Sequence, residues 1–313
     1  MRKFIYIFII GLLGMVMAAC GSSDASDNSN ADGGETITIT HELGETDVEK
    51  NPQKVVVFDF GMLDTLDALE LDVVAGIPKG NIPAYLEKYE SEEYENVGSL
   101  KEPDFEKIAE IDPDLIIISG RQAELYDQFM ELSPTIHLGV DTTRYMDSFR
   151  ENLNAIGDIF DMQDEVDQEL AAIEDSITEM QEKAAGTDEN ALIILANDDK
   201  ISAYGPSSRF GIIHDEFGVP AVDEGIEAST HGMNVSFEYV TTQDPDRLYV
   251  IDRGAAVDGQ SNAQQIVENE LVKNTKVYEN DNIYYLNPDY WYLSGGGLIS
   301  VSEMIKEIEE SLN

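Results

Sequence analysis

Two arginines at equivalent places in a repeated segment are the side chains best suited to bind an anion. Residues 105–121, FEKIAEIDPDLIIISGR, and 237–253, FEYVTTQDPDRLYVIDR, are two copies of one unit offset by 132 residues. The copies end in Arg121 and Arg253. A guanidinium keeps its charge at any ordinary pH and offers a planar fork of donors to oxygen ligands. The repeat therefore predicts a pair of cationic groups for an anionic ligand.

Three further residues have the types and settings that could complete such a site. Arg209 lies in PSSRFG, where a turn leads into an expected helix, His231 lies in the polar loop EASTHGMN, and Tyr292 lies in the aromatic segment NPDYWYLSGGGL. Fe(III) takes six ligands, favours oxygen donors such as phenolate and accepts imidazole. A chelator that supplies four oxygens leaves two positions, which His231 and Tyr292 could fill. The plainer interpretation is that the arginines are loop cations paired with some of the 63 acidic side chains.

Each copy of the repeat divides into the elements that would position its arginine. A short helix is followed by Asp-Pro-Asp, which cannot continue it. An apolar run typical of a β-strand comes next, at residues 115–118 and 248–251. Ligands of open α/β sheets bind outside the carboxyl ends of the strands, which is where Arg121 and Arg253 fall. Two such lobes facing each other would direct both cations into one cleft.

Strand and helix patterns alternate in both halves of the chain, which predicts mostly parallel sheets. The expected strands cover residues 37–40, 55–60, 115–118, 136–138, 192–196, 201–204, 248–251 and 283–286. The expected helices cover residues 62–69, 85–94, 105–111, 123–132, 205–217, 237–243 and 298–312, and residues 76–80 are expected to form a turn. Between Tyr145 and Met180 the apolar spacing predicts two helices, with Asp161 as the N-cap of the second. That helix, over 162–184, would be about 34 Å long and could join two lobes stiffly.

The first residues predict export and attachment to a membrane. Residues 1–19 have the charged start and apolar stretch of a signal peptide. Cys20, the only cysteine, is followed by Gly-Ser-Ser and resembles the lipidated cysteine of a bacterial lipobox, although Met17 stands where leucine is usual. A lone cysteine cannot form an intrachain disulfide. Residues 20–36 are small and polar, as in a flexible tether.

The balance of charge excludes some partners. With 63 acidic and 19 basic side chains the net charge is −44, which disfavours nucleic acid and anionic lipid headgroups. A halotolerant or alkaliphilic source would fit, because the Debye length falls to about 3 Å at 1 M salt. We expect Arg144, Arg150 and Arg247 to be solvated. The four histidines are dispersed, which argues against a His-rich zinc site, and the chain offers no convincing nucleophile and base pair, so we expect no enzyme.

The lipobox, the tether, the two α/β lobes and the paired FE…DPD…R units resemble a class III substrate-binding lipoprotein of an ABC importer, over the whole chain. The motifs ISGRQ, GPSSRFG, THG, VIDRG and NPDYWYLSGGGL are similar to those of the ferric catecholate branch, which takes up petrobactin or related tetradentate catecholates. The resemblance implies an α/β fold of two similar Rossmann-like lobes with central, mostly parallel sheets joined by a single long helix. It also implies no intrinsic cofactor, with Fe(III) carried as the siderophore complex.

The resemblance assigns roles to individual residues. Three arginines would contact the catecholates, and a His and Tyr pair would complete the iron sphere if the chelate leaves two positions open; these five ligand residues are Arg121, Arg209, Arg253, His231 and Tyr292. One glutamate per lobe would dock on the permease, and the repeat singles out Glu106 and Glu238. Asp104 and Ser236, which precede these helices, are expected to cap them.

The implied organisation is a signal peptide (1–19), a tether from the lipidated cysteine (20–36), an N-terminal lobe (37–142), a helical connector (143–185) and a C-terminal lobe (186–313). We expect a monomer, lipid-anchored to the outer face of the cytoplasmic membrane of a Gram-positive cell, with a ferric siderophore and an ABC permease as partners and no nucleic acid. The alternatives are the same fold carrying another iron chelate, such as a hydroxamate, or haem or cobalamin, a tethered surface hydrolase, and an acidic structural lipoprotein.

Overall fold

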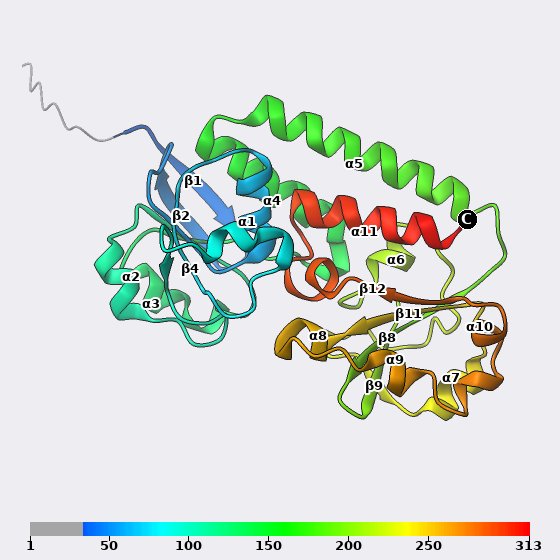
Figure 1. Ribbon diagram of the computed structural model, residues 1–313. Helices are drawn as coiled ribbons and strands as arrows, with labels where there is room; N and C mark the ends of the chain where they lie inside the picture. The colour runs from blue at the N-terminus through cyan, green and yellow to red at the C-terminus, as the bar shows by residue number, and fades with distance from the viewer. Residues whose placement is uncertain (1–33) are drawn as a thin grey trace, which may run out of the picture. The chain divides into compact units, whose positions relative to one another are not determined.

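The computed structural model describes residues 34–313, which build two lobes around two five-stranded sheets (Figure 1). The expected signal peptide, Cys20 and residues 20–33 of the tether lie outside the described residues. A hairpin opens the folded part, in which β1 (Thr36–His41) pairs antiparallel with β2 (Gly44–Glu49). The first strand thus includes Thr36, the last residue assigned to the tether. None of the helices in residues 34–313 has the length and apolar character needed to span a membrane.

The first lobe has a sheet in the order β5-β4-β3-β6-β7, with every neighbouring pair parallel. Its strands are β3 (Val55–Val57), β4 (Val74–Ile77), β5 (Glu95–Asn96), β6 (Leu115–Ile118) and β7 (Thr135–His137). Its helices are α1 (Phe60–Ala68), α2 (Phe105–Ile111) and α3 (Tyr126–Met130), with 3-10 turns η1 (Ala84–Glu90) and η2 (Ala123–Leu125). All four side chains of β6 are buried because both faces of the sheet are covered.

The second lobe has a sheet in the order β10-β9-β8-β11-β12, in which β8, β11 and β12 are parallel and β9 and β10 run antiparallel to their neighbours. Its strands are β8 (Ala191–Asn197), β9 (Lys200–Tyr204), β10 (Met233–Val235), β11 (Arg247–Asp252) and β12 (Ile283–Leu286). Its helices are α6 (Ile212–Asp215), α7 (Phe237–Gln243), α8 (Arg253–Asp258), α9 (Ala263–Val267) and α10 (Lys276–Glu279), with the 3-10 turn η4 (Val272–Asn274). The expectation of mostly parallel sheets is confirmed for the two sheets together, since every pair is parallel in the first lobe and two of the four pairs are parallel in the second.

The two copies of the repeat fold alike. In each, the helix ends at the first aspartate of Asp-Pro-Asp, and Asp112 and Asp244 adopt left-handed backbone with φ of 52° and 42°. The carboxylate of the second aspartate then accepts hydrogen bonds from main-chain amides just before a neighbouring strand, β3 in the first lobe and β8 in the second. Asp114 accepts hydrogen bonds from the Gln53 and Lys54 amides, at 2.8 and 2.9 Å. Asp246 accepts one from the amide of Asn190, at 3.1 Å.

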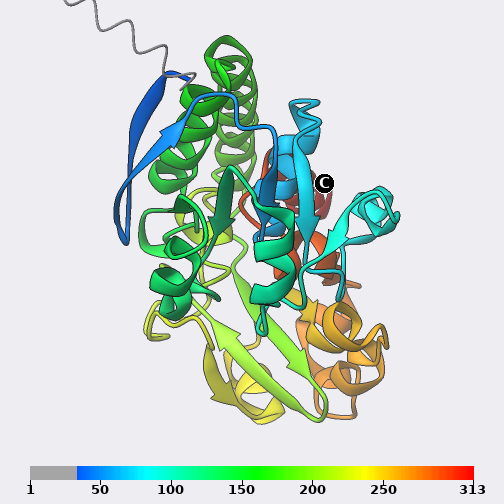
Figure 2. The same cartoon turned by 90° about the vertical axis from the view of Figure 1, so that its left-hand side faces the viewer.

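Two helices connect the lobes: α4 (Tyr145–Phe160), which follows the turn η3 (Thr142–Arg144), and α5 (Gln163–Ala184). Figure 1 shows α5 running along both lobes, and Figure 2 shows α4 and α5 side by side. The expectation that Asp161 caps α5 is wrong. Asp161 instead ends α4 with φ of 54°, and its carboxylate binds the side chains of Lys50 and Asn51 at 2.6 and 2.9 Å. Aspartate suits an N-cap and also tolerates left-handed backbone, so its type alone did not decide between the two.

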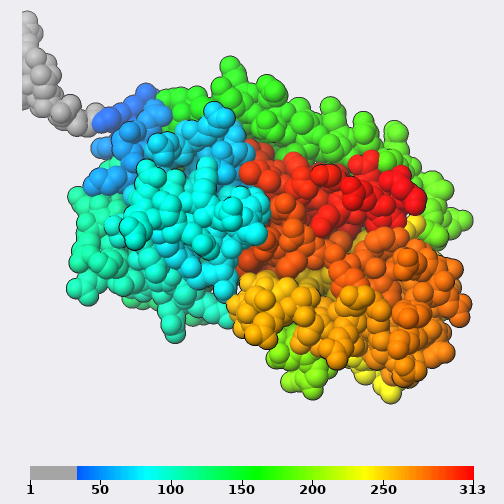
Figure 3. Space-filling view, viewed as in Figure 1, coloured from blue at the N-terminus to red at the C-terminus, as the bar shows by residue number. Residues whose placement is uncertain are grey.

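The last helix, α11 (Leu298–Ser311), packs against both α1 and α5. It follows the π-helical turn η5 (Asp289–Leu293). One continuous hydrophobic core includes side chains of α1, α4, α5 and α11 and the inner faces of both sheets. In the space-filling view, the last residues, in red and orange, lie between the first lobe and the rest of the second (Figure 3).

Some expected element boundaries are wrong for local reasons. The strand expected over residues 55–60 ends at Val57, because Asp59 caps α1 by accepting the Met62 amide at 2.9 Å. The helix expected over residues 205–217 is mostly turns, since Ser207 adopts φ of 56°, and only α6 is helical. Residues 76–77, expected in a turn, end β4.

Candidate functional site between the lobes

A cleft of about 570 Å³ lies between the lobes and receives side chains from both. On the side of the first lobe, the segments after β3, β6 and β7 and the start of α4 contribute to its walls. Its walls from the second lobe come from the loops around Arg209 and His231 and from the aromatic segment, residues 287–297. Four of the five predicted ligand residues are part of this lining, namely Arg121, Arg209, His231 and Tyr292.

Arg121 and Arg209 converge on one acceptor. Arg121 follows β6 in an exposed turn, and its Nη2 donates to the main-chain oxygen of Tyr292 at 3.2 Å. Arg209 is only partly exposed, and its Nη2 donates to the same oxygen at 2.7 Å. Burial and the neighbouring charge of Arg121 lower the pKa of Arg209. Two guanidinium groups from opposite lobes are therefore brought together around a single carbonyl dipole.

Tyr292 has the electrostatic setting of a potential anion. The Arg209 guanidinium lies over its ring, 4.1 Å from the ring centre. Burial by itself would raise the pKa of the phenol, but the charges of Arg209 and Arg253 outweigh burial and lower it. Tyr204, close by, shows the contrast, since burial raises its pKa to about 12. The cleft thus holds a tyrosine whose phenol loses its proton more readily than usual, and a phenolate oxygen suits a hard metal ion.

Arg253 lies beside the cleft and is not part of its lining. It is the first residue of α8, directly after β11, and its Nη1 donates to Oδ1 of Asn197 at 3.1 Å. Its charge nevertheless acts on the Tyr292 phenol. The structure therefore gathers Arg121, Arg209 and Tyr292 closely and adds Arg253 from one side.

His231 is exposed at the mouth of the cleft, in the loop before β10. The next residue, Gly232, has φ of 72°, and a side chain there would collide with the ring of Tyr204. Glycine is thus needed for the loop to turn at this point. Residues 34–313 contain no cluster of three or more His, Cys, Asp or Glu side chains arranged to hold a metal ion by themselves.

Several residues of the lining were missed by the sequence analysis. Lys101 adds a third cation to the cleft, and Asp59 and residues 139–142 follow the carboxyl ends of β3 and β7. The rule that predicted Arg121, that ligands lie beyond the carboxyl ends of parallel strands, would have found Asp59 and residues 139–142 too. Lys101 lies in an irregular loop without a comparable signal.

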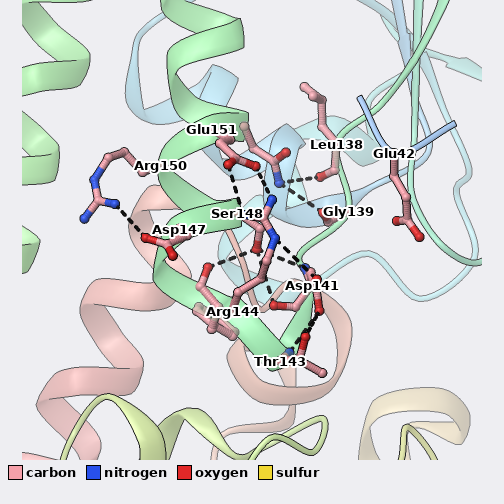
Figure 4. Close-up of polar contacts among 12 residues, drawn as sticks. Glu42, Leu138, Gly139, Asp141, Thr143, Arg144, Asp147, Ser148, Arg150 and Glu151 are labelled. Atoms are coloured by element: carbon pink, nitrogen blue, oxygen red, sulfur yellow. Dashed lines mark hydrogen bonds and ion pairs between the residues drawn. The ribbon is translucent and has the colours of Figure 1, made fainter. Parts of the chain in front are cut away.

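A second cavity of about 530 Å³ adjoins the cleft and shares Glu42, Gly139 and Asp141 with it. Figure 4 shows its wall, where Arg144 binds Asp141 and Glu151. Arg144 and Arg150 are exposed, as expected, although both form ion pairs. The expectation that Arg247 is solvated is wrong, because it is 7% exposed and binds Glu189, Tyr284 and the Ser311 carbonyl.

Glu106 and Glu238 are both exposed second residues of equivalent helices, α2 and α7. Asp104 caps α2 as expected, by accepting the Lys107 amide at 3.1 Å. Ser236 makes no such cap on α7, and its hydroxyl donates to the Glu238 carboxylate at 2.7 Å instead. The pair thus lies on matching helices outside the cleft.

Comparison with known proteins gives consistent matches over most of the chain. The family model described as "Periplasmic binding protein" matches residues 55–290. The chain is 52% identical over 315 residues to the petrobactin-binding protein YclQ of Bacillus subtilis, covering 100% of this chain and 99% of that protein.

Two solved structures are also similar. The crystal structure of YclQ superposes with a TM-score of 0.88 at 54% identity, covering 89% of this chain and 99% of that one. The periplasmic catecholate-siderophore binding protein VctP of Vibrio cholerae superposes with a TM-score of 0.84 at 32% identity, covering 88% of this chain and 100% of that one.

Proposed function

The chain belongs to the periplasmic binding protein family and is a solute-binding protein of the class III fold, and on that premise we propose that its solute is a ferric catecholate siderophore. The observation that carries the proposal is the convergence of Arg121 and Arg209, from opposite lobes, in a cleft of an otherwise strongly acidic protein. A chelate with net negative charge would replace the Tyr292 carbonyl as their acceptor. The petrobactin and catecholate ligands in the names of the relatives support this class of ligand.

We assign the ligand contacts as follows. Arg121 and Arg209 donate charge-assisted hydrogen bonds to the catecholate oxygens, and Arg253 adds positive potential from the side. His231 and Tyr292 complete the coordination of Fe(III) where the chelate leaves two positions open. The lowered pKa of the Tyr292 phenol supports this role. The protein binds and releases its cargo without chemistry and needs no cofactor of its own.

Delivery and location follow from the same proposal. Cys20 carries the lipid that holds the protein at the outer face of the cytoplasmic membrane of a Gram-positive cell. The protein acts as a monomer and docks on the permease of an iron-siderophore importer, with Glu106 contacting one half of the permease and Glu238 the other. The exposure of both glutamates on equivalent helices supports this assignment.

A titration tests the ligand class. Trp291 is the only tryptophan and lines the cleft, so its fluorescence should report binding. We expect strong quenching and tight binding with an iron-loaded bis-catecholate, and weaker binding with the iron-free form and with a neutral ferric hydroxamate. Tightest binding of the hydroxamate would contradict the proposal, because a neutral chelate gains little from convergent guanidinium groups.

A further inference from the structure

The aromatic segment, residues 287–297, is fastened to the first lobe by a buried carboxyl group. Asp64 of α1 is fully buried, and its two oxygens accept the amides of Ile299 and Ser300 at the start of α11, at 3.0 and 2.8 Å. Gly297 passes so close to Asp64 that any side chain there would collide with the carboxyl group. A residue of the first lobe therefore sets the position of the segment that carries Tyr292.

A row of oxygen atoms continues from Asp64 into that segment. Oδ2 of Asp64 lies 2.9 Å from the Tyr85 hydroxyl, which lies 2.7 Å from the Ser294 hydroxyl. The Ser294 hydroxyl lies 2.6 Å from the main-chain oxygen of Asp289. All three separations are hydrogen-bond distances between oxygens. The row thus consists of four oxygens and three links.

Counting hydrogens shows which state of Asp64 satisfies the row. Each link needs one hydrogen, and the Asp289 carbonyl has none to give. If the Asp64 carboxylate is ionised, only the hydroxyls of Tyr85 and Ser294 supply hydrogens. Two hydrogens cannot fill three links, so at one link two oxygen lone pairs would face each other. With a protonated carboxyl group Asp64 donates to Tyr85, Tyr85 to Ser294, and Ser294 to the Asp289 carbonyl. Only the protonated form fills every link.

The surroundings of Asp64 agree with this count. None of the ion pairs formed by residues 34–313 includes Asp64. The titratable groups that face it are tyrosines: Tyr85 from η1, Tyr145 from α4 and Tyr290 from the aromatic segment. Burial raises the pKa of Asp64 to about 7, against the opposing effect of the hydrogen bonds that it accepts from Ser300 and Ile299.

We propose that Asp64 is a positioning residue for the ligand cleft, protonated in the ligand-free protein, whose hydrogen completes the row that holds the Tyr292 segment against the first lobe. Loss of this proton leaves one link unfilled and loosens the segment. Ligand binding should therefore weaken as the pH rises through neutrality, beyond any change due to the ligand itself. This effect on binding rests on the proposed function, whereas the protonation of Asp64 does not.

The first test measures the proton directly in the ligand-free protein. Difference infrared spectra between about pH 5.5 and pH 8.5 should contain a protonated-carboxyl band that titrates near pH 7. We expect Asp64→Asn to remove this band. Asp67→Asn is the matched control and should retain it, because Asp67 lies on the same helix and also accepts a tyrosine hydroxyl, that of Tyr89, but is paired with Lys88. A band unchanged in Asp64→Asn would overturn the proposal.

A second variant decides the direction of the hydrogen bond and covers the case in which Asp64→Asn does not fold. Tyr85→Phe leaves the carboxyl group in place and removes its partner. If Asp64 donates to Tyr85, this substitution should move the midpoint of the Asp64 titration to lower pH. A midpoint that moves to higher pH would show that Tyr85 donates to an ionised carboxylate, and it would refute the inference.

The third measurement links the proton to binding. For each protein, the Kd for a ferric catecholate at about pH 8.5 is divided by the Kd at about pH 6. This ratio should be about two- to tenfold larger in wild type and in Asp67→Asn than in Asp64→Asn, because the loss of one hydrogen bond changes the affinity by that factor. Comparing proteins cancels the ligand's own titration. Equal ratios would overturn the positioning role. If no protein bound the catecholate, the proposed function would fail, while the infrared band would still decide the state of Asp64.

Discussion

The two copies of the repeated unit agree where they build the sheets and differ where they meet the cleft. Asp112 and Asp244 have the same left-handed backbone, and the aspartate two residues later holds a neighbouring strand in both lobes. Beyond the strand, Arg121 extends from an exposed turn to the Tyr292 carbonyl. Arg253 instead begins a helix that Asp252 caps at 3.0 Å. The positions that serve the scaffold are thus alike, whereas the ends that face the ligand have diverged.

We expect the largest loss of ligand affinity when the two repeat arginines, Arg121 and Arg253, are replaced together with Arg209. The triple substitution Arg121→Ala, Arg209→Ala and Arg253→Ala should weaken binding of the ferric catecholate by roughly two to four decades, at about 1.5–3 kcal/mol for each of the two charged hydrogen bonds of Arg121 and Arg209. Loss of the positive potential of Arg253 should add a smaller amount. Fluorescence titration of Trp291 measures this. Arg150→Ala is the control, because Arg150 is an exposed arginine paired with Glu174. If the Kd of the triple variant stays within threefold of wild type, the three arginines do not bind the ligand.

Charge reversal at Glu106 and Glu238 tests whether the two lobes dock on the permease through equivalent residues. Glu106→Lys with Glu238→Lys should reduce iron uptake by cells about tenfold or more, since like charges replace opposite ones at a docking surface. Ligand affinity should not change, because both residues lie outside the cleft lining. Exposed Glu110, on the same helix as Glu106, provides the control substitution. Undiminished uptake would rule out this pair as the docking residues.

Separating the two repeat arginines sharpens the comparison. Arg121→Ala should cost about tenfold more affinity than Arg253→Ala, because only Arg121 lines the cavity while Arg253 is held by Asn197. Arg253→Ala should in turn raise the pKa of Tyr292, from which it removes a positive neighbour. Ultraviolet titration of the phenolate measures this second effect. Equal losses of affinity would mean that the lobes rearrange on binding and make the arginines equivalent.

The smallest effect concerns the part of the scaffold that the two copies share. Asp246→Asn should lower the free energy of unfolding by about 0.5–1.5 kcal/mol at neutral pH, as one hydrogen bond does. Burial opposes ionisation of Asp246, but Lys276 and the Asn190 amide lower its pKa overall. The stability it contributes is therefore present above the unfolded pKa near 4 and lost as the pH falls through the lower folded value. Chemical denaturation at several pH values measures this; a constant difference between the two proteins would be inconsistent with the mechanism.

The sequence predicted residues of the cleft lining better than it predicted the joint between the lobes. Arg121, Arg209, His231 and Tyr292 line the cleft, and each was singled out by its type and by a local setting at a strand end or in a loop. Their roles as ligands stay a prediction. The contact of Asp64 with Ser300 joins residues 236 positions apart, and such a contact leaves no period or spacing in the chain. A buried aspartate in the middle of an apolar helix was the available signal, since such a group needs partners.

Because α11 packs against α1, the hydrophobic core of the first lobe is completed by the last residues of the chain. Met62, Leu63 and Leu66 are fully buried in a core that also contains Leu298, Val301 and Ile305. A chain that stops before Leu298 leaves this face of α1 open to water, although every strand of the first sheet has already been made. The N-terminal half alone therefore lacks part of its hydrophobic core, and we expect a fragment cut between the lobes to aggregate.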